Sequence, residues 1–199
     1  MITVDCVQGT PEWFAARCGI PSASNFDKIV TSAGAPSKQA EKYMYQLAAE
    51  RVTGRTEESY NNAAMERGKE METEARSLYE LIKDAKVEQV GVCYPNEKKL
   101  IACSPDGLVG EDGLIEIKCP MAYASVEYIL NGKLPTDYVQ QVQGQMLVTG
   151  RKWVDFVSYY PGLKPLIVRV TRDERFLLAL DEALKTFCAD LEKIVERIK

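Results

Sequence analysis

The sequence predicts an α/β (α+β) fold in which a central mixed β-sheet is flanked by helices. Apolar residues recur with a helical period near both ends of the chain, and with a period of two in several segments between them. The expected order is three helices, three strands, two helices, two strands and one helix, which is typical of a sheet covered by helices. With 199 residues, 46% of them hydrophobic, residues 1–199 are expected to form a single domain.

The N-terminal part is expected to be helical. Thr10 before Pro11 is typical of an N-cap followed by the first residue of a helix. The segment SNFDKIV predicts a short second helix, with Ser24 as its N-cap. Helical spacing of apolar residues predicts further helices at 38–52 and at about 63–83.

Alternating apolar residues predict the strands of the sheet. The segments 86–94, 99–104 and 114–119 are expected to form an antiparallel meander through the turns PNEK and GEDG. Two more strands are expected at 153–160 and 165–171. The remaining helices are expected at about 122–131, 136–149 and 173–198.

The chain contains no histidine, and this restricts its chemistry. The absence excludes Ser-His-Asp and Cys-His catalysis, and also zinc or iron bound by histidine. A metal site would therefore use oxygen ligands, which select hard cations such as Mg²⁺, Mn²⁺ or Ca²⁺. The six cysteines form no CxxC pair and are expected to be thiols.

Charge and hydropathy limit the partners. The formal net charge of −4 argues mildly against a nucleic-acid partner, although a local basic surface can coexist with an acidic exterior. The sequence shows neither a signal peptide nor the run of ~18 apolar residues that a membrane span needs. We therefore expect a cytoplasmic protein without a membrane partner.

The segment CSPDGLVGEDGLIEIKCP contains the strongest candidate site. Strand alternation places Glu116 and Lys118 on the face opposite Ile115 and Ile117, and the hairpin can return Glu116 beside Asp106. Two adjacent carboxylates repel each other, and a divalent cation between them removes the repulsion. A nearby lysine can orient a water or stabilise charge on a phosphoryl oxygen. The alternative is an ordinary surface hairpin with a Glu–Lys pair.

Glu72 is a further candidate, on the helix expected at about 63–83. It falls at the margin of the apolar stripe, near Gly68, Ala75 and Tyr79. It is therefore the acidic residue of this helix that is most expected to face the sheet. The alternative is a boundary glutamate whose carboxylate reaches water.

Five sequence blocks then suggest a family. In chain order they are WFAARCGIPSAS, ERGKEMETEAR, ACSPDG, EIKCP and YVQQVQGQMLVTG, followed by a strand pair before the last helix. Together they resemble the bacteriophage lambda exonuclease (YqaJ-like viral recombinase) family, which has a restriction-endonuclease-like PD-(D/E)XK core. The resemblance implies digestion of one strand of linear double-stranded DNA in the 5′-to-3′ direction, dependent on Mg²⁺. Mn²⁺ is expected to substitute.

The resemblance also implies the partners. Digestion would start at 5′-phosphorylated double-stranded DNA ends and leave a 3′ single-strand overhang for a single-strand annealing protein in recombination. A homotrimer ring around the DNA is implied as well. Candidate basic residues for its channel, each of which could instead be a solvated surface charge, are Lys28, Lys38, Lys42, Arg51 and Arg55.

The resemblance assigns roles around the hairpin. Asp106, Glu116, Glu72 and the Ile117 carbonyl would bind the metals, two ions per site. Lys118 would orient the attacking water and help to deprotonate it, a role suited to a lysine whose pKa is lowered by partial burial.

A glutamine completes the expected site. The resemblance places Gln141 beside the metal ligands. At helical spacing Gln145 shares a face with Gln141, and Gln143 does not. Gln141 is therefore the first choice among the three.

A pocket for the terminal phosphate is the last implied feature. It maps onto Arg17, Ser24 and Ser104, and also onto Ser22. An arginine fork and hydroxyl groups near a helix N-terminus favour a phosphate. Without the resemblance, Arg17 could equally be a surface arginine at a helix end.

Two other functions remain open from the sequence. One is a structure- or sequence-specific endonuclease of the same fold acting on DNA. The other is an inactive module that binds DNA ends. The presence of Asp106, Glu116 and Lys118 speaks against the inactive module.

Overall fold

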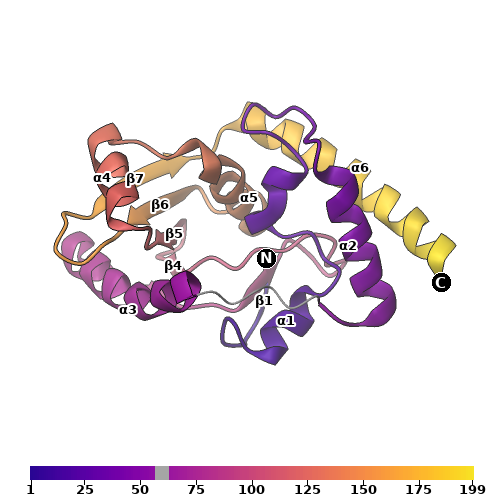
Figure 1. Ribbon diagram of the computed structural model, residues 1–199, viewed down its shortest axis with the longest axis horizontal. Coiled ribbons are helices and arrows are strands. Elements are labelled where there is room, and N and C mark those ends of the chain that lie inside the picture. Colours follow the sequence, from indigo (N-terminus) through magenta and orange to yellow (C-terminus); the bar gives the residue numbers. More distant parts are fainter. Residues whose placement is uncertain (57–62) are drawn as a thin grey trace.

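A computed structural model describes residues 1–56 and 63–199 (Figure 1). The side chains of residues 63–67 and 69 are outside the described part, and so are the first residues of the block ERGKEMETEAR. The helices are α1 (Pro11–Arg17), η1 (Ala23–Lys28, 3₁₀), α2 (Ala40–Thr53), α3 (Ala63–Lys83), α4 (Ala122–Asn131), η2 (Thr136–Tyr138, 3₁₀), α5 (Val139–Thr149) and α6 (Glu174–Ile198). The strands are β1 (Ile2–Val4), β2 (Val87–Glu88), β3 (Val92–Tyr94), β4 (Gly107–Val109), β5 (Gly113–Lys118), β6 (Trp153–Ser158) and β7 (Leu166–Thr171).

The main sheet has the strand order β2-β4-β5-β6-β7. Strands β5 and β6 pair in parallel, and the other neighbours pair antiparallel. A second sheet consists of β1 and β3. The predicted central mixed sheet flanked by helices is therefore confirmed (Figure 1).

The predicted meander of three strands is wrong. The segment 86–94 is divided between β2 and β3, which belong to different sheets. Residues 99–104, all within the described part, form no strand and meet Cys93 only through an isolated bridge at Cys103. The partner of β5 in the hairpin is instead β4, which begins directly after Asp106.

The helix starts are partly as predicted. Thr10 caps α1 by accepting a hydrogen bond from the Trp13 N–H, as expected from the Thr-Pro pair. The second helix is a 3₁₀ helix, and its N-cap position is Ser22, not Ser24. Ser22 is also held by a backbone bridge to Ala102, and this tertiary contact determines where the helix starts.

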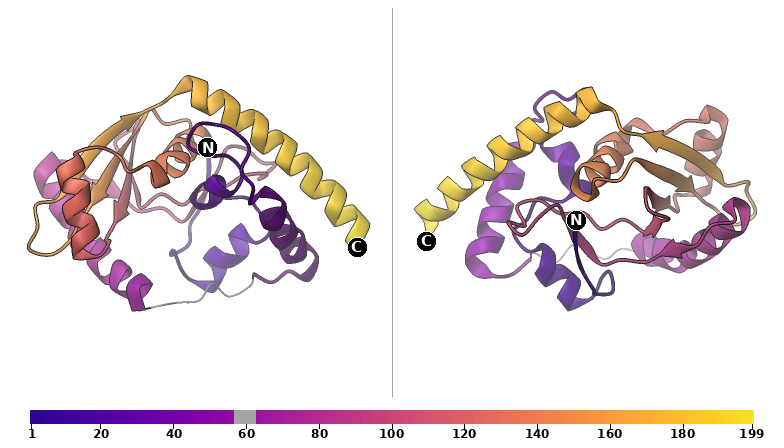
Figure 2. Two further views of the ribbon diagram at one scale, coloured as in Figure 1. Left: turned by 45° about the horizontal axis from the view of Figure 1, so that its top comes forward. Right: turned by 180° about the vertical axis from the view of Figure 1, so that it is seen from behind.

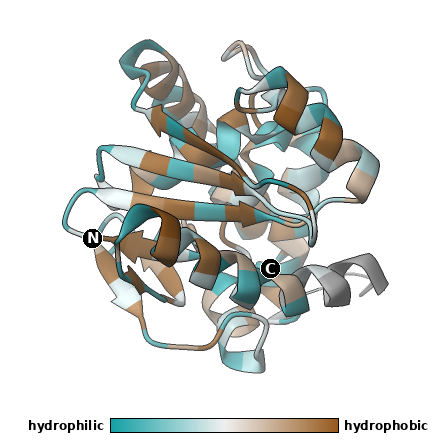
Figure 3. Cartoon of the chain, turned by 90° about the vertical axis from the view of Figure 1, so that its left-hand side faces the viewer, coloured by the Kyte–Doolittle hydropathy of each residue, from teal (hydrophilic) through white to brown (hydrophobic). Residues whose placement is uncertain are grey.

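The two faces of the main sheet are covered by different helices. On one face, Ile115 and Ile117 pack with Ala75 and Tyr79 of α3. On the other face, Leu114 and Phe156 pack against Val142 and Met146 of α5. Figure 3 shows many hydrophobic residues along the strands of the sheet. Each fully buried side chain of this size contributes about 1.5–3 kcal/mol, so the central strand β5 is held firmly from both sides.

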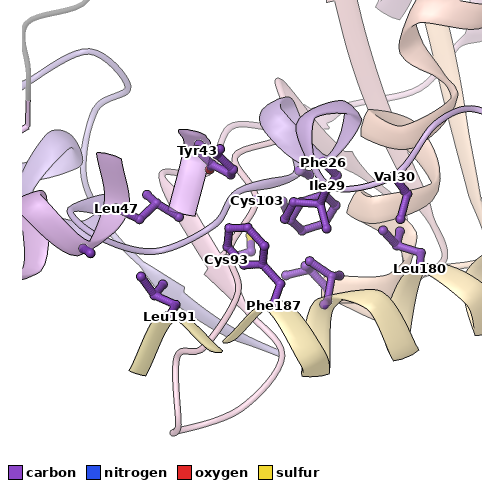
Figure 4. Packing of buried hydrophobic residues seen from close by; sticks show 14 of the residues in the cluster. Phe26, Ile29, Val30, Tyr43, Leu47, Cys93, Cys103, Leu180, Phe187 and Leu191 are labelled. Carbon is purple, nitrogen blue, oxygen red and sulfur yellow. The ribbon is translucent and has the colours of Figure 1, made fainter. Parts of the chain in front are cut away.

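The third part of the core joins η1 and α2 to α6. Phe26, Tyr43 and Phe187 lie in this cluster together with Leu180 and Leu191 of α6 (Figure 4). Helix α6 extends along the edge of the molecule, and the C-terminus lies at its far end (Figure 2). This cluster fixes η1 beside α5.

A glycine permits the close contact between α5 and η1. A Cβ at Gly144 would lie 2.4 Å from Phe26 Cδ2. The absence of a side chain therefore lets the helix that presents the glutamines approach the segment that presents Ser22 and Ser24.

The six cysteines, all within the described residues, are thiols, as expected. Across residues 1–56 and 63–199, no helix combines the length and the apolar character needed to cross a bilayer.

Candidate active site

The β4–β5 hairpin brings Asp106 beside Glu116. The Asp106 N–H donates to the Ile115 carbonyl at 3.2 Å. The Ile117 N–H donates to Asp106 Oδ2 at 2.5 Å. Asp106 is thus fixed against the backbone of β5 on either side of Glu116, by its own N–H at Ile115 and by its carboxylate at Ile117. The contact seen for Ile117 is through its N–H, and a role for its carbonyl as a metal ligand stays a prediction.

Glu116 lies in the central strand with only 2% of its surface exposed. Gln141 Nε2 donates to its Oε1 at 2.6 Å, and Gln145 Nε2 donates to its Oε2 at 2.5 Å. Lys118 Nζ forms an ion pair with Oε1 at 2.7 Å. A buried carboxylate needs such partners, and here three donors fix its orientation.

Gln143 lies outside this group, as the helical spacing predicted. Its Nε2 donates to the Thr171 carbonyl at 2.9 Å, and its Oε1 accepts from the Asp173 N–H at 3.0 Å. It therefore joins α5 to the segment before α6. Sequence reasoning had placed Gln145 on the same face as Gln141, and the structure brings both to Glu116.

Glu72 reaches the site from α3 and forms an ion pair with Arg76 one turn later. Burial raises the pKa of Glu72, and the Arg76 guanidinium opposes that rise. Glu116 is close enough to raise the pKa of Glu72 further. Helix periodicity did not single out Arg76, since its partner is visible only when the two side chains are in place.

Each carboxylate of the site disfavours the ionised form of its neighbours. Burial raises the pKa of Asp106 well above its usual value, and Glu116 and Glu72 add to the effect. For Lys118, burial lowers the pKa, but Glu116 and Asp106 together outweigh it and the net pKa is raised. The expectation of a lowered lysine pKa is therefore wrong, because it considered burial without the two carboxylates. Lys118 is held as an ammonium ion.

The donor set fits a hard divalent cation. Asp106, Glu116 and Glu72 offer oxygen ligands, and their mutual repulsion is the penalty that such an ion removes. Within the described residues, no three His, Cys, Asp or Glu side chains are yet close enough together to enclose an ion. To complete such a set of ligands, the Glu72 carboxylate would have to leave its ion pair with Arg76 and bind the metal ion.

A second group of polar side chains comes from α1 and η1. Arg17 Nη2 donates to Ser22 Oγ at 2.8 Å and to Ser24 Oγ at 3.1 Å, and the two hydroxyl oxygens lie 3.2 Å apart. Burial lowers the pKa of Arg17. Among the described residues no carboxylate forms an ion pair with it. A partly buried arginine without a carboxylate is suited to an anion.

Ser104 is joined to this group through Trp13. The indole Nε1–H donates to Ser104 Oγ at 3.0 Å, and the Arg17 guanidinium lies 4.0 Å from the centre of the Trp13 ring. The structure therefore brings together all four residues predicted for the phosphate pocket. Trp13 is the first residue of the family block WFAARCGIPSAS, but sequence reasoning assigned it no role, because an aromatic residue in a helix is most often explained by packing.

Both groups line one cavity of about 880 Å³. We call Glu72, Asp106, Glu116 and Lys118 the carboxylate end, and Arg17, Ser22, Ser24 and Ser104 the arginine end. The two ends are close along the chain, since Ser104 is two positions before Asp106. A ligand in this cavity would contact carboxylates at one end and cationic or hydroxyl groups at the other.

Of the predicted channel residues, the structure places Lys28 on this cavity, with its Nζ 5.0 Å from the centre of the Tyr43 ring. Arg51 is engaged elsewhere, with the Gly19 carbonyl and Glu192.

The mixed sheet and the Asp-Glu-x-Lys set on its central hairpin define a protein with the PD-(D/E)XK nuclease fold. The model of the YqaJ-like viral recombinase domain matches residues 12–152. The chain therefore belongs to the YqaJ-like viral recombinase family.

Solved structures agree with this assignment. An alkaline exonuclease from Laribacter hongkongensis, LHK-Exo, is 38% identical over 95% of this chain and 96% of its own, with a TM-score of 0.87. A structure of LHK-Exo in complex with dAMP gives 39% identity over 96% of both chains and a TM-score of 0.86. A phage-related exonuclease from Haemophilus somnus 129PT shares the fold at 16% identity, with a TM-score of 0.68 over 90% of this chain and 96% of its own. Comparison with curated protein sequences gave no significant match.

Proposed function

We propose that this protein is a Mg²⁺-dependent 5′-to-3′ exonuclease that digests one strand of linear double-stranded DNA from 5′-phosphorylated ends. The product would be a 3′ single-strand overhang for a single-strand annealing protein. Family membership and two exonuclease structures at 38% and 39% identity support a DNA exonuclease. The polarity and the metal are what the family resemblance implies, and the chemistry of the site is consistent with both.

The observation that supports the proposal best is the cavity with two chemically different ends. A terminal 5′-phosphate would be held by the arginine end, through Arg17, Ser22 and Ser24. The phosphodiester bond to be cut would then lie at the carboxylate end. Because only the 5′ terminus presents a phosphate in this register, the arrangement favours one polarity.

Two Mg²⁺ ions, or Mn²⁺ in their place, would be held by Asp106, Glu116, Glu72 and the Ile117 carbonyl. When bound, the ions supply Lewis-acid stabilisation of charge on the reacting phosphate and lower the pKa of water. Gln141 and Gln145 orient the Glu116 carboxylate through one hydrogen bond to each oxygen.

Lys118 has a cationic role in this proposal. Its ammonium ion, held by Glu116, can orient a water molecule and stabilise negative charge on a phosphoryl oxygen. The raised pKa favours these roles over that of a proton acceptor.

Timed digestion of linear duplexes labelled separately at the 5′ and the 3′ end, with and without Mg²⁺, tests the proposal. The 5′ label should be released first as mononucleotide, only with the metal, while the 3′ label stays on long fragments. Early release of the 3′ label would contradict the polarity. A covalently closed circular duplex tests the endonuclease alternative, since nicking of the circle would favour it.

The assembly is also part of the proposal. A homotrimer ring that encloses the DNA would confine the basic side chains that contact phosphates to its channel. Light scattering on the purified protein should give a mass of about three times 22.3 kDa, and a monomeric mass would contradict the ring.

A further inference from the structure

We infer that Trp13 is a positioning residue that sets the preference for phosphorylated 5′ ends by fixing Arg17 and Ser104. This inference rests on the proposed function of the arginine end. Trp13 touches both residues at once, one through its indole N–H and the other through its ring face. It thus links the cation of α1 to the segment leading into Asp106.

The hydrogen bond determines how Ser104 can act. An indole N–H can only donate, so Ser104 Oγ is the acceptor in this 3.0 Å contact. The hydroxyl hydrogen of Ser104 is then available for donation into the cavity that Ser104 lines. A phosphate oxygen can only accept, so Trp13 presets Ser104 as a donor for that ligand.

The ring face determines how Arg17 can act. A guanidinium 4.0 Å from the indole centroid is in the range of a cation–π contact, which restricts its plane. Arg17 uses its Nη2 group to donate hydrogen bonds to the hydroxyls of Ser22 and Ser24. An arginine has five N–H donors, so others remain for an anion in the orientation that the ring imposes.

The backbone around Ser104 does not depend on Trp13. Gln8 Nε2 donates to the Pro105 carbonyl at 2.9 Å and to the Val90 carbonyl at 3.0 Å. Cys103 is held by paired backbone hydrogen bonds to Cys93. A change at Trp13 should therefore alter the side chains of the arginine end and leave Asp106 in place.

The test compares kcat/KM on duplexes with a 5′-phosphate and with a 5′-hydroxyl end. Trp13→Phe keeps an aromatic face for Arg17 and removes the N–H, so the phosphate-to-hydroxyl ratio should fall about 2- to 10-fold. Trp13→Ala removes both contacts and should lower the ratio about 10- to 100-fold. In both variants the loss of kcat/KM on phosphorylated ends should exceed any loss on hydroxyl ends, whereas a general loss of folding would lower both values in the same proportion.

The chain offers a matched control in its second tryptophan. Trp153 also lies under an arginine, with Arg169 3.7 Å from its ring centre, but it does not line the cavity. Trp153→Phe should leave the ratio unchanged. It also leaves Trp13 as the sole tryptophan, so its fluorescence should change on titration with inorganic phosphate.

A double-mutant cycle decides whether Trp13 acts through Ser104. In a Ser104→Ala background, Trp13→Phe should lower the ratio no further. If the two substitutions lower the ratio independently, so that their effects multiply, the inference is overturned. It is also overturned if Trp13→Phe leaves the ratio unchanged while Arg17→Ala lowers the ratio. Equal rates on both ends by the unchanged protein would instead reject the phosphate pocket itself, and with it this inference.

Discussion

The carboxylate end and the arginine end of the cavity are built in opposite ways. At the carboxylate end, three acidic groups are crowded together, and burial and repulsion raise the pKa of Asp106 and Glu72. At the arginine end, a cation is surrounded by neutral hydroxyls and an aromatic ring. The carboxylates of the first end repel one another despite the cations of Lys118 and Arg76, whereas the arginine of the second end has no carboxylate partner among the described residues. In the proposed function, the carboxylate end performs the chemistry and the arginine end positions the substrate.

The largest effect is expected from a substitution of Glu116, which would alter the carboxylate end and leave the arginine end unchanged. Glu116→Gln removes a charge from the proposed metal site, so cleavage should fall at least about 10³-fold. The increase in melting temperature that Mg²⁺ produces in the unchanged protein should disappear, because a ligand stabilises only the fold that binds it. Thermal melts with and without Mg²⁺ provide the measurement. A normal Mg²⁺ shift in this variant would remove Glu116 from the metal site.

Lys118→Ala should separate catalysis from binding within the carboxylate end. Loss of one group that stabilises developing charge costs about 10²–10³-fold in kcat. Binding of 5′-phosphorylated duplex in Ca²⁺ should remain, since the arginine end is untouched. Near-normal turnover in a rapid-quench assay would refute the proposed role of Lys118.

Arg17→Ala tests the arginine end. A hydrogen bond to a charged group contributes about 1.5–3 kcal/mol, so the preference for phosphorylated ends should fall about 10- to 100-fold. Activity on hydroxyl ends should be nearly unchanged, in contrast to the two changes above. A proportional loss on both kinds of end would show that the two ends do not have separate tasks.

Gln145 and Gln143 form a matched pair on one helix. Gln145→Met removes a donor to Glu116 and should lower kcat about 5- to 10-fold, since one hydrogen bond to a carboxylate is lost. Gln143→Met should lower stability by about 1–3 kcal/mol and leave kcat unchanged at low temperature, because its partners are backbone groups outside the cavity. Steady-state kinetics and urea denaturation of both variants test the distinction.

The smallest expected effect concerns stability and pH. Because the folded pKa of Asp106 is raised, ionising it costs stability that is absent below the unfolded pKa of about 3.9 and grows as pH rises towards the folded pKa. Asp106→Asn should therefore raise the melting temperature of the metal-free protein by about 2–4 °C at neutral pH. The difference should shrink on acidification to about pH 4. A difference that is constant with pH would contradict the assigned repulsion.

Sequence patterns predicted one end of the cavity better than the other. The helix at 63–83 and the hairpin turn follow from local periodicity and turn residues, so Glu72, Asp106 and Glu116 could be placed on elements that meet. The parallel pairing of β5 with β6 could not be predicted, because no local pattern specifies a strand partner so far along the chain. The sign of the Lys118 pKa shift was missed for a different reason: Glu116 and Asp106 were expected nearby, but only the effect of burial was considered.

The arginine end was visible from the sequence only through family resemblance. Arg17, Ser22, Ser24 and Ser104 have no periodicity that marks them as a group. Ser22 and Ser24 are linked to Ser104 indirectly, through Arg17 and Trp13. Trp13 belongs to one of the family blocks, but nothing in the sequence indicated its contacts with Arg17 and Ser104. Finding the residues proposed to position a ligand therefore required the folded structure more than finding the residues proposed to react.

The most direct test is digestion of a linear duplex in which one strand carries a 5′-phosphate, the other a 5′-hydroxyl, and each a different internal label. With Mg²⁺, we expect the phosphorylated strand to be shortened from its 5′ end much faster than the other strand, and Arg17→Ala to reduce this difference. Equal degradation of both strands by the unchanged protein, or shortening from the 3′ ends, would contradict the account.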